Sequence, residues 1–121
     1  MKKILIAEDD KFLSSAYKLK LGKSGFDVQV GGNGNEVMTL LKTFLPDLIL
    51  LDLVMPIKDG FLTIEEVRAI ESFKKIPILV ASNLGQKEDI ERAIKLGAND
   101  FVVKSDMSLD QLIKKINTMI G

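Results

Sequence analysis

The sequence contains no cysteine and no histidine, and these absences exclude whole classes of chemistry. Without these residues there is no disulfide, no zinc site of the usual type, no thiol nucleophile and no histidine general base. Long apolar runs are also missing, because the opening run from Ile4 to Ala7 is too short for a signal peptide or a membrane span. We therefore expect a cytoplasmic protein with no membrane partner, whose chemistry uses carboxylates, hydroxyls, amines and an external ion.

An excess of charge of either sign is missing as well. The 17 basic and 17 acidic residues give a formal net charge of zero, so the chain lacks the positive field that drives non-specific binding to nucleic acid. We expect no direct nucleic-acid partner. The 121 residues, of which 46% are hydrophobic, suffice for one domain with a single core, spanning residues 1–121.

Five apolar segments have the features of β-strands. Four are short runs rich in Ile, Leu and Val between polar or proline residues, as in strands that are buried on both faces. They are Ile4 to Ala7, Leu48 to Leu51, Ile78 to Ala81 and Phe101 to Val103. In the fifth segment, Phe26, Val28 and Val30 alternate with polar residues, which predicts a strand at the edge of the sheet.

Helical patterns lie between and after these strands. The clearest helix follows a capping box formed by Ser108 and Gln111, and its apolar positions are Leu109, Leu112, Ile113, Ile116 and Ile120. Weaker apolar stripes run from Leu13 to Leu21, Val37 to Phe44, Ile64 to Ile70 and Ile90 to Ile94. Gly25 and Gly97 stand where helices end before a strand. Five strand-then-helix units predict an α/β fold, a doubly wound five-stranded parallel sheet with helices on both faces.

The carboxyl ends of the predicted strands carry most of the notable polar residues. They are Glu8-Asp9-Asp10 after the first strand, Asp52 after the third, Ser82 at the end of the fourth and Lys104 after the fifth. Ligands of open parallel sheets bind at this edge. A single polar residue there can simply mark the end of a strand, but four such ends together predict a site.

These residue types favour phosphoryl chemistry at a metal ion. The three carboxylates of Glu8, Asp9 and Asp52 would repel one another unless a cation lay among them. Oxygen ligands without nitrogen or sulfur favour Mg²⁺ or Mn²⁺. Lys104 and Ser82 supply the charge and the hydroxyl that hold the oxygens of a transferring phosphoryl group. Asp52 is then the nucleophile that forms an aspartyl phosphate.

In order and spacing, these motifs resemble the receiver domain of bacterial response regulators, a CheY-like, flavodoxin-like fold, over the whole chain. The matching segments are Ile4 to Asp10, Leu50 to Pro56 with Asp59-Gly60, Pro77 to Ser82 and Phe101 to Lys104. The resemblance implies strand order 2-1-3-4-5. It also implies a stand-alone receiver in two-component (phosphorelay) signal transduction, which is a phosphoacceptor domain and not a conventional enzyme.

The resemblance assigns a phosphorylation and metal site. It implies that Asp52 accepts the phosphoryl group and that Asp9, Asp52 and the backbone carbonyl of Val54 bind Mg²⁺. Glu8 is expected to be a neighbouring, water-mediated partner of the ion.

A conformational switch and two kinds of partner are implied as well. Lys104 and Ser82 assist the transfer, and Ser82 with Phe101 forms the switch. The phosphodonor is a histidine kinase or a histidine phosphotransfer protein. A downstream protein is expected on the face made by the fourth helix, the fifth strand and the fifth helix, around Lys87, Glu91, Lys95 and Phe101.

Two residues depart from the usual family pattern, and two more occupy positions that influence hydrolysis of the acyl phosphate in the family. Ser105 replaces the proline that usually follows the lysine, and because a cis bond to serine would cost about 2.5–4 kcal/mol, we expect a trans bond or an altered loop. Asn83 replaces a small residue, so we expect altered access to the phosphate pocket or an altered rate. Val54 and Leu84 are apolar and cannot position water by hydrogen bonding, so we expect slow self-dephosphorylation.

One alternative function stays open on the sequence. A degenerate receiver would act as a phosphorylation-independent interaction module, which Asn83 and Ser105 favour and the retained Asp9, Asp52, Ser82 and Lys104 oppose. A haloacid-dehalogenase-like phosphatase fits poorly because Lys11 stands where the second Asp of its D-x-D motif would lie. A flavodoxin-like FMN carrier also fits poorly, since three consecutive acidic residues would repel the phosphate. Adaptor, relay intermediate and phosphate sink remain equally open as roles of a receiver.

Overall fold

The computed structural model of the chain describes residues 1–120 and alternates strands with helices. The strands are β1 (Lys3–Ala7), β2 (Asp27–Gly31), β3 (Leu48–Leu51), β4 (Ile78–Ser82) and β5 (Asp100–Val103). The helices are α1 (Lys11–Lys23), α2 (Gly34–Leu40), α3 (Gly60–Ala69), α4 (Lys87–Leu96) and α5 (Leu109–Ile120). Short 3-10 turns, η1 (Glu71–Phe73) and η2 (Lys104–Asp106), follow α3 and β5. No helix within residues 1–120 combines the length and the apolar character needed to cross a bilayer.

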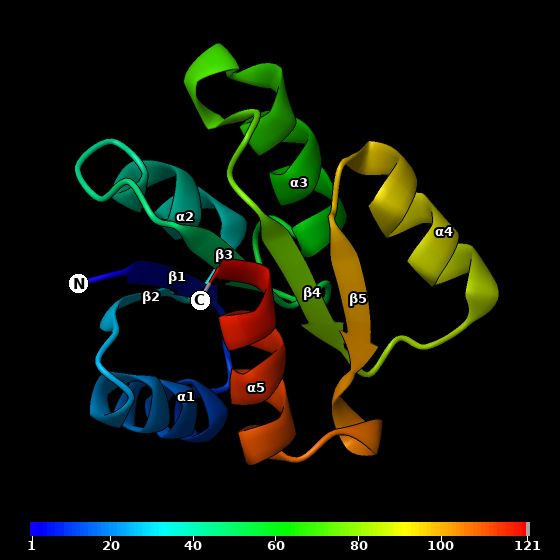
Figure 1. The fold of residues 1–121 in the computed structure, drawn as a ribbon. Coiled ribbons are helices and arrows are strands. Elements are labelled where there is room, and N and C mark those ends of the chain that lie inside the picture. Colours follow the sequence, from blue (N-terminus) through cyan, green and yellow to red (C-terminus); the bar gives the residue numbers. More distant parts are fainter. Residues whose placement is uncertain (121) are drawn as a thin grey trace.

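All five strands pair in parallel in one sheet with the order β2-β1-β3-β4-β5 (Figure 1). This confirms the doubly wound α/β fold and the strand order predicted from the sequence. It also confirms the prediction for the alternating segment around Val28, because β2 lies at the edge of the sheet. Parallel pairing brings the carboxyl ends of all the strands to one edge of the sheet, the edge toward which the arrowheads of β4 and β5 point in Figure 1.

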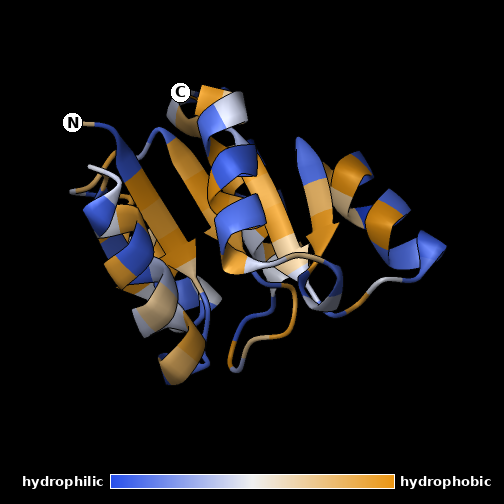
Figure 2. Ribbon diagram, turned by 60° about the horizontal axis from the view of Figure 1, so that its bottom comes forward, coloured by the Kyte–Doolittle hydropathy of each residue, from blue (hydrophilic) through white to orange (hydrophobic). Residues whose placement is uncertain are grey.

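Alternate residues of β1, β3, β4 and β5 enter two separate cores, whereas the apolar residues of the edge strand β2 enter only one. On one face of the sheet, Leu5, Ile49 and Val80 pack with the apolar residues of α2, α3 and α4. On the other face, Ile4 and Leu50 pack with those of α1 and α5. The strand interiors are therefore apolar on both sides, as Figure 2 shows by their colour, while the outer faces of the helices carry polar residues. Covering both faces explains why the strands read as continuous apolar runs.

Side-chain caps fix where four helices begin, including α2, where the Asn33 side chain accepts a hydrogen bond from the Glu36 amide. The Asp10 carboxylate accepts a hydrogen bond from the Leu13 amide at 3.0 Å, and that of Asp59 caps α3 in the same way. The predicted capping box of α5 is present, since Ser108 and Gln111 exchange hydrogen bonds of 2.8 and 3.2 Å. These caps hold the amino-terminal ends of α1, α3 and α5 close to the carboxyl ends of the strands.

Helix α2 is shorter than its apolar stripe. The stripe continues to Phe44, and both Leu41 and Phe44 are buried, but the helix ends at Leu40. The next residues form tighter turns in which the Thr43 amide donates to the Leu40 carbonyl at 3.1 Å. Pro46 disfavours helical geometry in Leu45, so a helix could not continue beyond Phe44, and the apolar side chains of the turns still reach the core.

Gly60 allows the loop after β3 to approach the end of that strand closely. Its amide donates to the Leu53 carbonyl at 2.9 Å. A Cβ at this position would lie 2.6 Å from the Leu53 Cα and closer still to the Asp52 carbonyl oxygen. Backbone atoms cannot move away as a flexible side chain can, so only glycine fits here.

We expect Gly60→Ala to lower the free energy of unfolding by about 2 kcal/mol or more, because the added methyl group clashes with backbone. Urea denaturation followed by circular dichroism would measure this loss. Gly22→Ala is the matched control, because nothing lies within 4 Å of a Cβ at that helical position. It should leave stability unchanged or raise it by up to about 0.5–1 kcal/mol. Equal midpoints for the two variants would contradict the proposed clash.

Candidate metal and phosphoryl site

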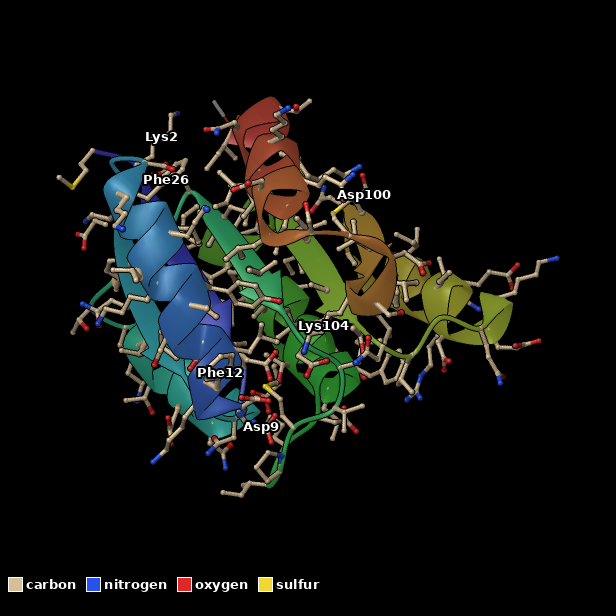
Figure 3. The ribbon with its side chains drawn as sticks, turned by 90° about the horizontal axis from the view of Figure 1, so that it is seen from below. Lys2, Asp9, Phe12, Phe26, Asp100 and Lys104 are labelled. Atoms are coloured by element: carbon tan, nitrogen blue, oxygen red, sulfur yellow. The ribbon has the colours of Figure 1, made fainter. Side chains whose placement is uncertain are left out.

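A depression of about 370 Å³ lies at the carboxyl edge of the sheet. Its lining residues are Glu8, Asp9, Asp10, Asp52, Val54, Ser82, Asn83 and Lys104. Figure 3 shows this edge, with Asp9 and Lys104 on the same side of the molecule although they lie far apart in sequence. The structure therefore brings together the polar residues that the sequence placed at four strand ends.

The main chain holds the two most buried carboxylates in place. The Asp52 amide donates to the Ala7 carbonyl at 2.9 Å, and the Glu8 amide donates to the Gly31 carbonyl at 3.0 Å. Both residues thus continue the hydrogen-bond ladders of the sheet by one step. Their exposed fractions are only 4% for Glu8 and 8% for Asp52. The carboxylates are therefore fixed by the scaffold rather than by a mobile loop.

Three carboxylates form a cluster that suits a hard divalent cation. One oxygen from each of Glu8, Asp9 and Asp52 lies within 4.8 Å of the others. Asp9 is exposed and leaves one side open to water, which Mg²⁺ usually retains in its coordination shell. Val54 lines the same depression, and its amide lies 3.4 Å from an Asp52 carboxylate oxygen. The donor set fits Mg²⁺ or Mn²⁺, as expected from the sequence.

Lys104 partly neutralises this cluster. Its ammonium donates to an Asp52 oxygen at 3.0 Å and to Glu8 on the other side. Burial alone would lower the pKa of Lys104, but the hydrogen bond to Glu8 and the charge of Asp52 outweigh it and raise the pKa above its usual value. Lys104 therefore stays protonated at neutral pH. The pKa of Glu8 is raised because its burial outweighs the stabilising hydrogen bond from Lys104.

The contact between Lys104 and Glu8 was missed in the sequence. The resemblance implied only that Glu8 lies near a metal ion, and no local pattern shows which carboxylate a distant lysine will meet. Two features could have indicated this contact. Lys104 has a long side chain and follows β5, the neighbour of β4, and two acidic residues lie within its reach. Asp10 was predicted to cap α1 and does so, but it also lines the depression.

Ser82 and Asn83 form the wall contributed by β4. The Ser82 side chain is fully buried, and its hydroxyl oxygen accepts a hydrogen bond from the Leu84 amide at 3.2 Å. Asn83 is exposed and lines the depression, so it stands where it could influence access to the site. Phe101 does not line the depression. It is half-buried on β5 and packs against the core on the side of α2, α3 and α4.

The loop after Lys104 follows the expectation for a chain without the usual proline. The peptide bond from Lys104 to Ser105 is trans, as are the other described peptide bonds. The chain then makes the 3-10 turn η2 before it enters α5. With serine after Lys104, the ammonium still reaches the acidic cluster.

We expect Asp52→Asn to be more stable than the wild type in EDTA, by about 1 kcal/mol, because it removes one of three crowded carboxylates that share one ammonium. Urea unfolding would measure the difference. Mg²⁺ should then stabilise the wild type more than the variant, since a ligand stabilises the state that binds it. Asp106→Asn is the control, because Asp106 is an exposed carboxylate outside the depression. Equal stabilities of Asp52→Asn and the wild type in EDTA would argue against repulsion in the cluster.

Comparison with known proteins agrees with this geometry. The sequence matches the response regulator receiver domain over residues 4–117. It is 34% identical over 120 residues to the chemotaxis protein CheY of Bacillus subtilis, and the alignment covers 98% of each chain. The Mn²⁺-bound form of response regulator Rcp1 superimposes with a TM-score of 0.82 at 28% identity, covering 98% of this chain and 91% of that one.

Some relatives are longer proteins. The DNA-binding dual master transcriptional regulator RpaA of Synechocystis is 32% identical over 120 residues, which cover 99% of this chain but only 49% of RpaA. The chain thus spans about half the length of that relative. The similarity nevertheless extends over nearly all of this chain in both curated relatives. The chain belongs to the response regulator receiver domain family of two-component signalling.

Proposed function

We propose that Asp52 accepts a phosphoryl group from the phosphohistidine of a histidine kinase or histidine phosphotransfer protein, in a reaction that requires Mg²⁺. The observation that carries this proposal is the meeting of three carboxylates, one ammonium and one buried hydroxyl in a single depression. An isolated carboxylate cluster would bind a cation without reacting. The addition of Lys104 and Ser82 provides groups for the oxygens of a phosphoryl group.

In the proposed transfer, an oxygen of the Asp52 carboxylate attacks phosphorus while the bond from phosphorus to the donor imidazole breaks. The imidazole nitrogen keeps the electron pair of that bond. The Lys104 ammonium, 3.0 Å from one Asp52 oxygen, orients the carboxylate and faces the incoming negative charge. The Val54 amide, 3.4 Å from the other oxygen, limits rotation of the carboxylate. The chain thus contributes mainly positioning and electrostatics.

Asp9, Asp52 and the backbone carbonyl of Val54 would hold Mg²⁺, with Glu8 as a partner through water. When bound, the ion neutralises charge on the phosphoryl oxygens. The Mn²⁺-bound relative supports a divalent cation of this kind. The contact of Glu8 with Lys104 fits an indirect role, because one Glu8 oxygen is already engaged by the ammonium.

The output of the proposed reaction is a change in a protein-binding surface. The Ser82 hydroxyl would turn toward the new phosphoryl group, and Phe101 would move inward on the neighbouring strand. Val80 and Phe101 pair directly across β4 and β5, so a shift of β4 reaches Phe101 at once. The surface is the face of α4, β5 and α5 around Lys87, Glu91 and Lys95, and the partner is a downstream protein.

We also propose that residues 1–121 act as one receiver domain that does not contact nucleic acid itself. The zero net charge supports this, because it lacks the positive field of a DNA-binding surface. RpaA is described as DNA-binding, but this chain covers only half of that protein. A cytoplasmic location belongs to the same proposal, since histidine kinases present their phosphohistidine there.

Incubation with acetyl phosphate and Mg²⁺ should add one phosphoryl group to the wild type, as detected by intact mass spectrometry. Asp52→Ala should acquire none, because the acceptor is gone. Asp9→Ala should acquire little at the same Mg²⁺ concentration, since it loses a ligand of the ion. Asp27→Ala, a surface carboxylate at the start of β2, is the control and should behave as the wild type.

A phosphoryl adduct that persists in Asp52→Ala would place the acceptor elsewhere. No adduct on the wild type, with Mg²⁺ shown to bind, would favour the interaction module that works without phosphorylation. Calorimetric titration of Mg²⁺ into the wild type and Asp9→Ala separates these cases, because it reports the ion without requiring transfer.

The phosphorylated protein should lose its label slowly, and Val54→Asn should accelerate the loss several-fold. Val54 lines the depression and its side chain is 58% exposed, so an asparagine there could hold an attacking water against the phosphoryl group. The decay of purified phosphoprotein in EDTA, followed by mass spectrometry, would measure the rate. Leu62→Asn is the control, being an exposed leucine on α3. Equal decay rates for the wild type and Val54→Asn would disprove the role assigned to Val54.

A further inference from the structure

A second cavity lies behind Lys104, on the face of the sheet covered by α1 and α5. Its volume is about 120 Å³. Seven of its lining residues are apolar and belong to the core of that face: Leu13, Tyr17, Ala81, Val102, Met107, Leu109 and Leu112. Lys104 and Ser108 complete the wall. The cavity is thus separate from the acidic depression, although Lys104 lines both.

The cavity lies between α1 and α5, over a small residue of β4. Ala81 on β4 is 98% buried and too short to fill the space between α1 and α5. At the surface an ion pair of 2.9 Å between Lys20 and Asp110 joins the two helices. The loop from η2 to α5, including Met107 and Ser108, closes one side. The space is therefore framed by regular elements and does not depend on a single loop.

Tyr17 provides a polar group in this apolar setting. Every fully buried polar side-chain atom among residues 1–120 has a hydrogen-bond partner. The Tyr17 hydroxyl makes no hydrogen bond with the described residues, so, although the residue is only 5% exposed, the hydroxyl itself must keep some contact with solvent. It lies near enough to Lys104 and to the acidic residues of the depression to feel their charges. Burial raises the pKa of Tyr17, which keeps the hydroxyl protonated and able to donate.

Charge and size define what could bind. The Lys104 ammonium is already engaged by Glu8 and Asp52, and these carboxylates disfavour an anion near the mouth of the cavity. Apolar walls disfavour a cation that would lose its water. An apolar protein cavity of roughly 150 Å³ takes up benzene, so about 120 Å³ suits one six-membered ring. The best occupant is small, neutral and mostly apolar.

We propose that the cavity between α1 and α5 binds a small neutral molecule with one ring and one hydrogen-bond acceptor, which the Tyr17 hydroxyl recognises. The ring contacts the apolar walls, and the acceptor oxygen receives the tyrosine proton in a hydrogen bond. An occupant also touches Lys104, a residue of the acidic depression. Binding itself does not require phosphorylation of Asp52.

Two isosteric probes, benzyl alcohol and ethylbenzene, test the proposal by titration into ¹⁵N-labelled protein. Both should cause saturable amide shifts around Ser108 and Leu109. Tyr17→Phe should weaken the binding of benzyl alcohol roughly fivefold, as expected for the loss of one neutral hydrogen bond. The same variant should bind ethylbenzene as tightly as the wild type does, or more tightly. Benzoate should bind at least about tenfold more weakly than benzyl alcohol, because of the neighbouring carboxylates.

Filling the space provides the second test. Ala81→Leu should abolish binding of both probes. If Ala81→Leu does not fold, Leu109→Phe is the alternative variant that fills the cavity from another lining residue. Shifts that do not saturate would overturn the proposal. The proposal would also be overturned if either probe still bound to a folded variant in which the cavity is filled. An equal loss of affinity for both probes in Tyr17→Phe would overturn it too. The unliganded spectrum of each variant establishes that it is folded.

Discussion

The ammonium of Lys104 lies between two buried carboxylates, and the arrangement of the carboxyl edge depends on this contact. Glu8 and Asp52 are almost inaccessible to water, and two such charges side by side would be strongly unfavourable without a counter-charge. One ammonium cannot balance three acids. Asp9 remains exposed beside the pair and leaves the cluster with an excess of negative charge. The remaining negative charge makes this cluster a suitable place for a divalent cation.

The sheet order explains how residues from distant parts of the chain reach this contact. Because β1 lies between β2 and β3, Glu8 and Asp52 extend adjacent strands and are held by main-chain hydrogen bonds. Lys104 leaves β5, two strands away from β3, and its long side chain spans the end of β4. A shorter cationic side chain would not cross that distance. The position of Ser82 at the end of β4, between acid and lysine, follows from the same order.

Most of the fold, and the residues that line the candidate site, could be predicted from the sequence. The spacing of apolar residues and the polar residues at the ends of strands are local signals. The edge strand around Val28 and the caps at Asp10 and Ser108 depend on a few neighbouring residues, and all were confirmed. The early end of α2 at Leu40 was not predicted, because its apolar stripe continues in a turn. The contact of Glu8 with Lys104 and the cavity at Tyr17 depend on packing between distant segments, which no sequence pattern encodes.

A single cation shared between acids also suggests how a local reaction could reach a distant surface. An aspartyl phosphate would replace the single charge of Asp52 by a larger negative charge with several acceptor oxygens. Lys104 would then be drawn toward the new oxygens and away from Glu8. Since Lys104 directly follows β5 and begins η2, its movement would act on the start of the segment that leads to α5. In the proposed reaction, the residue that stabilises the cluster would thus connect the change of charge at Asp52 with the segment between β5 and α5.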